Sequence, residues 1–292
     1  MSRLVMKFGG TSVGDVERIR RVARLVAAER AAGHKVAVVV SAMSGDTNRL
    51  VALADDAGKD LPPDQFDDEY DVVVATGEQV TTGLLALALR AMGVPARSWQ
   101  GWQIRVASSD AHGSARISDI DASAVAAAID GGEVAVIPGF QGVTAEDRIT
   151  TLGRGGSDTS AVAVAAALNA ARCDIYTDVD GVYTTDPRVC DKARKLDRIA
   201  FEEMLELASL GAKVLQTRSV ELAMRYKVRL RVLSSFEETD ENSGTLVCDE
   251  DEIMESKVVS GVAFSRDEAK MTLVKVQDRP GIAAAIFGPL SV

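Results

Sequence analysis

Short apolar runs alternate along this chain with longer segments in which apolar residues recur every three or four positions. Continuous apolar runs are typical of strands buried on both faces of a parallel sheet, and the wider spacing is typical of helices with one buried face. The runs predict strands at 4–8, 35–40, 134–138, 173–176 and 228–233. The spaced segments predict helices at 16–29, 80–92, 122–129, 201–210 and 214–224. This alternation predicts an α/β fold built on an open sheet.

The pattern between residues 41 and 80 is less regular. Small polar residues fill 41–48, and the acidic segment 55–71, with its two prolines, predicts a surface excursion whose charges are solvated. A short apolar run at 72–75 is followed by a turn at 76–78, so Glu78 is expected where the helix at 80–92 begins. Compensation of the helix dipole would explain a glutamate there without any ligand.

The segment 151–168, TLGRGGSDTSAVAVAAAL, places three glycines directly before a helical pattern. Glycines permit positive φ and a close approach of backbone N–H groups to a ligand, and a helix N-terminus attracts anions. Ser157 or Asp158 can cap this helix, and Arg154 projects from the loop. The segment therefore predicts an anion site, with a tight strand-to-helix turn and a solvated arginine as the alternative.

Composition narrows the class of protein. The 292 residues are 47% hydrophobic and 26% charged, as in globular proteins, and their number predicts one large and one small domain. A net charge of −10 argues against a nucleic-acid or membrane-surface binder but leaves room for a basic pocket. Three cysteines without CxxC spacing, the lack of a leader pattern and the lack of an apolar run of ~18 residues predict a cytoplasmic protein.

Polar residues follow most of the predicted strands, and the longest such loop is 177–188. In open α/β sheets, ligands bind at the carboxyl ends of the strands. The chain contains neither the G-x-x-x-x-G-K-[ST] loop nor the G-x-G-x-x-G spacing of the common nucleotide sites. A phosphate site in this protein must therefore use another loop design.

The segment KFGGTS at 7–12 resembles the opening of the amino-acid kinase family. The likeness is narrowed to the aspartokinases by LGRGGSDT at 152–159, TDVDGVYTTDPR at 177–188 and GAKVL at 211–215. The resemblance implies a three-layer αβα sandwich around a mainly parallel sheet. It also implies ATP-dependent phosphorylation of the side-chain carboxylate of L-aspartate to 4-phospho-L-aspartate, the first step toward lysine, threonine and methionine.

Phosphoryl transfer to a carboxylate needs no general base, because the nucleophile is already ionised, but it needs neutralisation of the charge on two anions. The resemblance implies a catalytic set of Lys7, Asp158 and Lys213. For the substrate it implies Arg154 at the α-carboxylate, Glu78 and Asp158 at the ammonium, and Ser41 and Thr47 near the reacting carboxylate. For the nucleotide it implies Lys7, Gly9, Gly10, Thr177, Asp178, Tyr183, Asp186, Arg188 and Lys213. Mg²⁺ is expected to bridge the phosphates with few protein ligands, and Asp186 to contact either the metal or the ribose.

The C-terminal part resembles the entry to a small ligand-binding ACT domain, at DRPG (278–281) and the following IAAAIFGPL. We therefore expect a catalytic domain at 1–236, an acidic linker at 237–257 and a partial ACT-like segment at 258–292. The chain ends inside that pattern, so we expect it to respond to neither lysine nor threonine and to expose the apolar residues Ile282, Ile286, Phe287 and Leu290. A homo-oligomer, dimer or tetramer, is expected from the resemblance, with amino-acid effectors in the full-length family form.

Two other functions compete with this one. A related kinase for glutamate, acetylglutamate, carbamate or UMP would share Lys7, Gly9 and Gly10, but the RGGSDT block and the ACT-like tail argue against it. A non-catalytic subunit that binds amino acids would have no need of Lys7, Arg154, Asp158 and Lys213. A hydrolase has no support, because Ser41 lacks His and Asp partners in triad order, and His34 and His112 lack ligand spacing.

Overall fold

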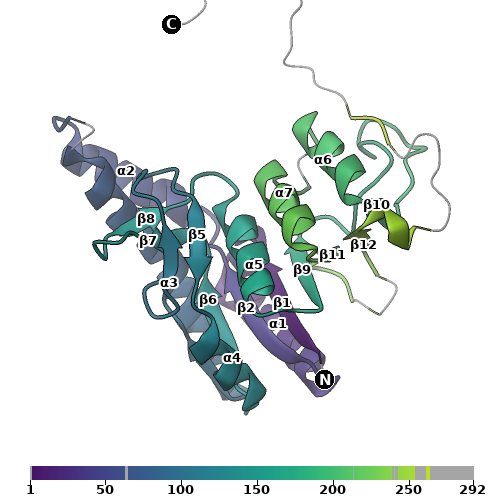
Figure 1. Cartoon of the computed structure of the whole chain (residues 1–292), viewed down its shortest axis with the longest axis horizontal. Helices are drawn as coiled ribbons and strands as arrows, with labels where there is room; N and C mark the ends of the chain where they lie inside the picture. The colour runs from purple at the N-terminus through teal and green to yellow at the C-terminus, as the bar shows by residue number, and fades with distance from the viewer. Residues whose placement is uncertain are drawn as a thin grey trace, which may run out of the picture.

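The fold is built on two sheets, and the computed structural model describes residues 2–62, 65–212, 214–238, 240, 243–253 and 261–263. Figure 1 shows the larger, eight-stranded sheet through the middle of the molecule. Its strands are, in spatial order, β10 (Arg198–Ala200), β12 (Thr245–Cys248), β11 (Leu230–Ser234), β9 (Arg172–Thr177), β1 (Arg3–Phe8), β2 (Lys35–Val40), β6 (Val134–Pro138) and β3 (Ala96–Ser98). All neighbours are parallel except β11 and β12. The smaller sheet has the order β5 (Ile117–Ile120), β4 (Val106–Ser108), β7 (Gln141–Val143) and β8 (Ile149–Thr151).

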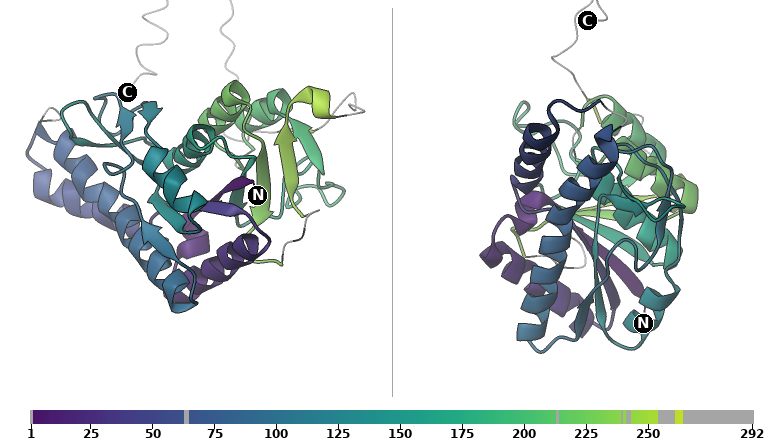
Figure 2. Two further views of the ribbon diagram at one scale, coloured as in Figure 1. Left: turned by 60° about the horizontal axis from the view of Figure 1, so that its bottom comes forward. Right: turned by 90° about the vertical axis from the view of Figure 1, so that its left-hand side faces the viewer.

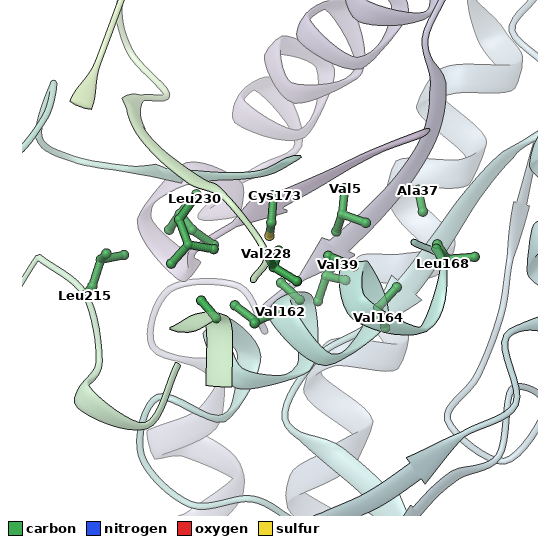
Figure 3. Packing of buried hydrophobic residues seen from close by; sticks show 14 of the residues in the cluster. Val5, Ala37, Val39, Val162, Val164, Leu168, Cys173, Leu215, Val228 and Leu230 are labelled. Atoms are coloured by element: carbon green, nitrogen blue, oxygen red, sulfur yellow. The ribbon is translucent and has the colours of Figure 1, made fainter. Parts of the chain in front are cut away.

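Helices cover both faces of the large sheet, because successive side chains of a buried strand point to opposite faces. On one face Leu4, Met6 and Phe8 pack against α1 (Val16–Ala31) and α3 (Asp67–Ala91). On the other face Val5 packs in a cluster with α4 (Ser123–Asp130), α5 (Gly156–Ala167), α6 (Phe201–Ser209) and α7 (Thr217–Tyr226). Figure 3 shows part of that cluster, including Val39 of β2 and Val162 of α5. The expected αβα sandwich around a mainly parallel sheet is confirmed.

The region between β2 and β3 differs from the expectation. The helix α2 (Asp46–Gly58) covers the start of the predicted excursion, and α3 begins before the excursion ends. From there α3 runs as one uninterrupted helix through the predicted turn at 76–78 (Figure 2). Gly77 suggested a turn, but it serves close packing, because a Cβ at this position would lie 2.8 Å from the Cβ of Ala42. Glu78 therefore lies in the middle of a helix and not at its start. Asp71, expected among solvated charges, is completely buried.

The helix α3 is long and apolar enough to cross a membrane by length and composition. Half of its most apolar window is buried inside the structure, and the helix packs against α1, α2 and β8. It also buries Asp71 and Glu78. These features are those of the core helix of a folded domain.

The interval 237–257, expected to be a linker, contributes to the large sheet. Its strand β12 pairs with β10 and β11. Thr245, Val247 and Cys248 of this strand are completely buried, although the acidic residues on either side of the strand suggested a linker. A short 3-10 helix, η3 (Glu250–Glu252), follows. Only residues 261–263 of the ACT-like segment are described, so its strands and its apolar residues from Ile282 to Leu290 lie outside the described residues.

Candidate active site

A cleft of about 810 Å³ opens where β1 and β2 end. The central strand β1 pairs with β2 on one side and with β9 on the other, so the chain continues from β1 to one side of the sheet and returns later on the other side. Such a change in strand order leaves a crevice at the carboxyl ends of the strands, where ligands of open α/β sheets bind. The cleft is lined by residues that follow β1 and β2, by α2 and α3, and by the glycine loop before α5.

Lys7 enters the cleft from the end of β1, on the sheet face that α5 covers. Its Nζ lies 2.6 Å from Oδ1 of Asp158 on α5, and both side chains are largely buried. The contact is a close ion pair between an ammonium and a carboxylate. A Cβ at Gly9 would lie 3.3 Å from Lys7 Nζ, and one at Gly10 would lie 3.1 Å from the carbonyl oxygen of Ala42. The absence of a side chain at Gly9 therefore leaves room for the Lys7 ammonium, and its absence at Gly10 leaves room for the loop that contains Ala42.

The glycine loop turns β8 into α5 with two left-handed residues, Gly153 at φ +74° and Gly155 at φ +72°. A Cβ on Gly155 would meet Cγ of Gln216 at 2.2 Å. Gly155 is also the N-cap, without a side-chain bond, so the expected capping by Ser157 or Asp158 is wrong. Asp158 lies in the first turn, with its carboxylate directed to Lys7. Arg154 is exposed and lines the cleft, beside the helix N-terminus that attracts anions.

Glu78 presents a buried carboxylate to the cleft from the middle of α3. Glu78 is only 3% exposed, and its Oε1 accepts a hydrogen bond of 3.0 Å from the backbone N–H of Ala42. Within the described part of the chain, Oε2 has no hydrogen-bond partner. Burial raises the pKa of Glu78 to about 7, and the N–H of Ala42 offsets part of that rise. A cation that reached Oε2 would stabilise the ionised form.

All the residues expected at the substrate line this one cleft. The cleft is lined by Lys7, Gly10, Ser41, Thr47, Glu78, Arg154 and Asp158. Lys213, expected near the phosphates, lies outside the described residues.

Five other residues expected at the nucleotide, Thr177, Asp178, Tyr183, Asp186 and Arg188, lie on a separate loop that begins at the end of β9. This loop adjoins the cleft, because the N–H of Gly9 bonds to the carbonyl of Tyr176 at 3.4 Å. Thr177 donates to Asp178 at 3.1 Å, Tyr183 donates to Asp180 at 3.0 Å, and Asp186 pairs with Arg188 at 2.9 Å. None of Thr177, Asp178, Tyr183, Asp186 and Arg188 lines the cleft.

The sequence-based reasoning missed two residues. Gln216, the N-cap of α7, lines the cleft and packs against Gly155. Asp71 accepts hydrogen bonds from the backbone N–H and the hydroxyl of Thr151, just before the glycine loop. The sequence feature that could have identified Asp71 is its spacing of seven residues from Glu78, which places both residues on one face of a helix. That spacing is informative only if the helix α3 is continuous from residue 67 to residue 91.

Comparisons with known proteins agree on one family. The model of the amino acid kinase family matches residues 2–234. The aspartate kinase of Stutzerimonas stutzeri is 57% identical over 292 residues, which are 100% of this chain and 69% of that protein. The crystal structure of aspartate kinase from Synechocystis is 44% identical with a TM-score of 0.71, over 85% of this chain and 40% of that one.

The structure of E. coli aspartokinase III in complex with aspartate and ADP is 33% identical to this chain, with a TM-score of 0.73, over 84% of this chain and 64% of that one. The likeness thus extends from the sequence to the arrangement of the sheet that carries the cleft. The chain belongs to the amino acid kinase family and, within it, to the aspartokinases.

Proposed function

We propose that this protein transfers the γ-phosphoryl group of ATP to the side-chain carboxylate of L-aspartate, giving 4-phospho-L-aspartate and ADP. The observation that carries the proposal is the charge pattern of one cleft. It holds a buried carboxylate with a free oxygen at Glu78, an unpaired guanidinium at Arg154 within the described residues, and an ammonium at Lys7. An amino dicarboxylate presents the complementary cation and two anions.

Glu78 and Arg154 would fix the amino-acid end of the substrate. Oε2 of Glu78 would accept from the substrate ammonium, which supplies the counter-charge that the buried carboxylate lacks. The guanidinium of Arg154 would bind the α-carboxylate through two parallel hydrogen bonds. Ser41 and Thr47, which line the same cleft, would lie near the side-chain carboxylate. Because Asp158 is already paired with Lys7, we assign the ammonium to Glu78 alone and the orientation of Lys7 to Asp158.

The reaction forms a bond between a carboxylate oxygen and the γ-phosphorus, and the bond to the β-phosphate oxygen breaks with its electron pair on ADP. No proton is transferred, since the nucleophile is ionised at neutral pH. The site must instead hold two anions in line and neutralise their repulsion. Lys7, fixed by Asp158 at 2.6 Å, is placed to do so at the end of β1. Lys213 is proposed as the second ammonium on the resemblance alone.

The nucleotide would bind beside the cleft, along Gly9, Gly10 and the loop after β9. Mg²⁺ would supply further neutralisation of the phosphates, and it commonly binds through phosphates, waters and one or two carboxylates. No group of three or more metal-ligating side chains occurs in the part of the chain that the structure describes. Asp178, which accepts from the neutral hydroxyl of Thr177, fits such a ligand better than Asp186, which is paired with Arg188.

Several wider properties are proposed from the family resemblance. We propose a cytoplasmic homo-oligomer, dimer or tetramer, that acts at the first step toward lysine, threonine and methionine and is regulated in its full-length family form by amino acids. The free thiols of Cys173, Cys190 and Cys248 fit a reducing compartment. We propose that residues 258–292 are part of an ACT-like regulatory domain, and that no nucleic acid or membrane takes part.

A substrate panel tests the proposed function. The protein is incubated with ATP, Mg²⁺ and hydroxylamine, which converts an acyl phosphate into a stable hydroxamate, and with aspartate, glutamate, acetylglutamate or no acceptor. ADP formation is followed in parallel with carbamate and UMP. Among these acceptors, we expect hydroxamate to form only with aspartate. Turnover with another acceptor would assign the protein to a different kinase, and binding of aspartate without turnover would favour a regulatory subunit.

A further inference from the structure

Asp71 is a completely buried carboxylate outside the cleft that accepts hydrogen bonds from two different segments. Its Oδ2 accepts from the backbone N–H of Thr151 at 2.9 Å, and its Oδ1 accepts from the hydroxyl of the same residue. From the loop 110–113 it accepts the backbone N–H of Gly113 at 3.0 Å and lies 2.9 Å from Nδ1 of His112, which donates in the tautomer with its hydrogen there. Burying an ionised carboxylate is costly unless it is well bonded, so this arrangement holds three segments in one geometry.

Those segments carry the Arg154 loop. Thr151 ends β8 three residues before Arg154, and the carbonyl oxygen of Gly113 would lie 3.1 Å from a Cβ on Gly153. Arg218 of α7 fixes the same region from the other side, because its guanidinium donates to the carbonyls of Leu152 and Ala115, each at 2.9 Å. The loop is thus anchored to α3 at its start and to α7 just before Arg154.

The same helix carries Glu78. Asp71 precedes Glu78 by two helical turns on one face of α3, about 10 Å along the axis. Glu78 is itself fixed by the N–H of Ala42. The two groups proposed to hold the substrate ammonium and α-carboxylate therefore belong to one frame, and Asp71 is the link between the helix and the loop.

We infer that Asp71 is a positioning residue that sets the spacing between Glu78 and Arg154, and through that spacing the affinity for the amino-acid substrate. This inference rests on the proposed function. It predicts a specific kinetic pattern, because the nucleotide loop and the Lys7–Asp158 pair do not depend on Asp71 for any hydrogen bond. A displaced Arg154 should weaken aspartate binding while leaving ATP binding as it is.

The test uses Asp71→Ala and Asp71→Asn with L-aspartate and ATP as the varied substrates. In Asp71→Ala we expect the KM for aspartate to rise about tenfold or more, because small misplacements at a site have large effects, with kcat and the KM for ATP within about threefold. Asp71→Asn should restore most of the affinity, because its amide oxygen can accept from His112 and Thr151 N–H while its amino group donates to the Thr151 hydroxyl. Calorimetric titration with aspartate should give the same order.

Asp174→Asn is the matched control. Asp174 is equally buried and is paired with Arg172 at the far end of β9, so this variant loses stability without a change in the KM for aspartate. If Asp71→Ala fails to fold, His112→Ala and His112→Asn are measured in place of the two Asp71 variants, since an asparagine amide can replace the Nδ1 donor of His112. Unchanged aspartate affinity in the alanine variants, or equal loss for both substrates, would overturn the inference. Wild-type protein that forms no aspartyl hydroxamate would instead overturn the proposed function and the inference with it.

Discussion

Replacing Glu78 with glutamine should raise the free energy of unfolding, relative to that of the wild type, as the pH increases from 5 to 8, and should weaken the affinity for aspartate. Burial raises the pKa of Glu78 from its ordinary value of 4.5 to about 7. The protonated form is therefore the one that folding favours. Its contribution to stability is complete below pH 4.5 and is lost as the pH rises through 7. Glutamine is neutral at every pH, so its stability does not follow this course.

The magnitude follows from the two pKa values. With 1.36 kcal/mol for each unit, the full effect is about 3 kcal/mol, and between pH 5 and pH 8 the free energy of unfolding of Glu78→Gln should rise by about 2.5 kcal/mol relative to the wild type. The comparison between two pH values cancels the fixed cost of burying the glutamine amino group. Protonation also removes the charge that is proposed to hold the substrate ammonium. We therefore expect kcat/KM for aspartate in the wild type to fall about tenfold for each pH unit below about 7.

Urea unfolding of both proteins at pH 5 and pH 8, without substrate, measures the stability difference. Glu206→Gln, on the exposed face of α6, removes the same charge without burial and is the control. In kinetics at pH 8, Glu78→Gln should raise the KM for aspartate about tenfold or more, as expected for loss of a charged hydrogen bond. A stability difference that does not change with pH, or an unchanged KM, would contradict the proposal that Glu78 is a buried, substrate-binding carboxylate.

Three further predictions concern the rest of the cleft. Lys7→Ala should lower kcat about a hundredfold or more with a much smaller change in aspartate affinity, since its charge acts mainly on the transferring group; initial-rate kinetics measure this, and wild-type turnover would remove Lys7 from the reaction. Arg154→Lys should raise the KM for aspartate about tenfold at constant charge, because an ammonium cannot make two parallel bonds; if the KM for ATP rises instead, Arg154 belongs to the nucleotide. Gly155→Ala should lower the free energy of unfolding by about 2 kcal/mol or more, from positive φ and the contact with Gln216; a loss below about 0.5 kcal/mol in urea unfolding would show that the loop adapts.

Much of the fold could be predicted because the buried strands carry a strong local signal. The run at 35–40 is β2 itself, and the run at 134–138 is β6. The helix α3 could not be predicted, because Gly77 and Thr76 have low helix propensity and only packing against Ala42 explains the glycine. Without the continuous helix α3, neither the burial of Glu78 nor the link through Asp71 could be predicted, since both depend on that helix.

The site could be predicted as a set of residues more readily than as a geometry. The family resemblance assigned Lys7, Glu78, Arg154 and Asp158 to one site, and in the structure all four line one cleft. That Asp158 pairs with Lys7 at 2.6 Å depends on the register between β1 and α5, which no local pattern determines. The same is true of Asp71, whose partners are between 41 and 80 residues away in sequence.

The most direct test of the central claim follows the oxygen atoms of aspartate. Aspartate labelled with ¹⁸O only in its side-chain carboxylate is incubated with the protein, ATP, Mg²⁺ and hydroxylamine, and the released phosphate is analysed by mass spectrometry. Hydroxylamine attacks the acyl carbon, so the oxygen that joined carbon to phosphorus leaves with the phosphate. We predict one ¹⁸O atom in each phosphate, and none when the label is in the α-carboxylate. Unlabelled phosphate in the first experiment, or labelled phosphate in the second, would contradict phosphorylation of the side-chain carboxylate.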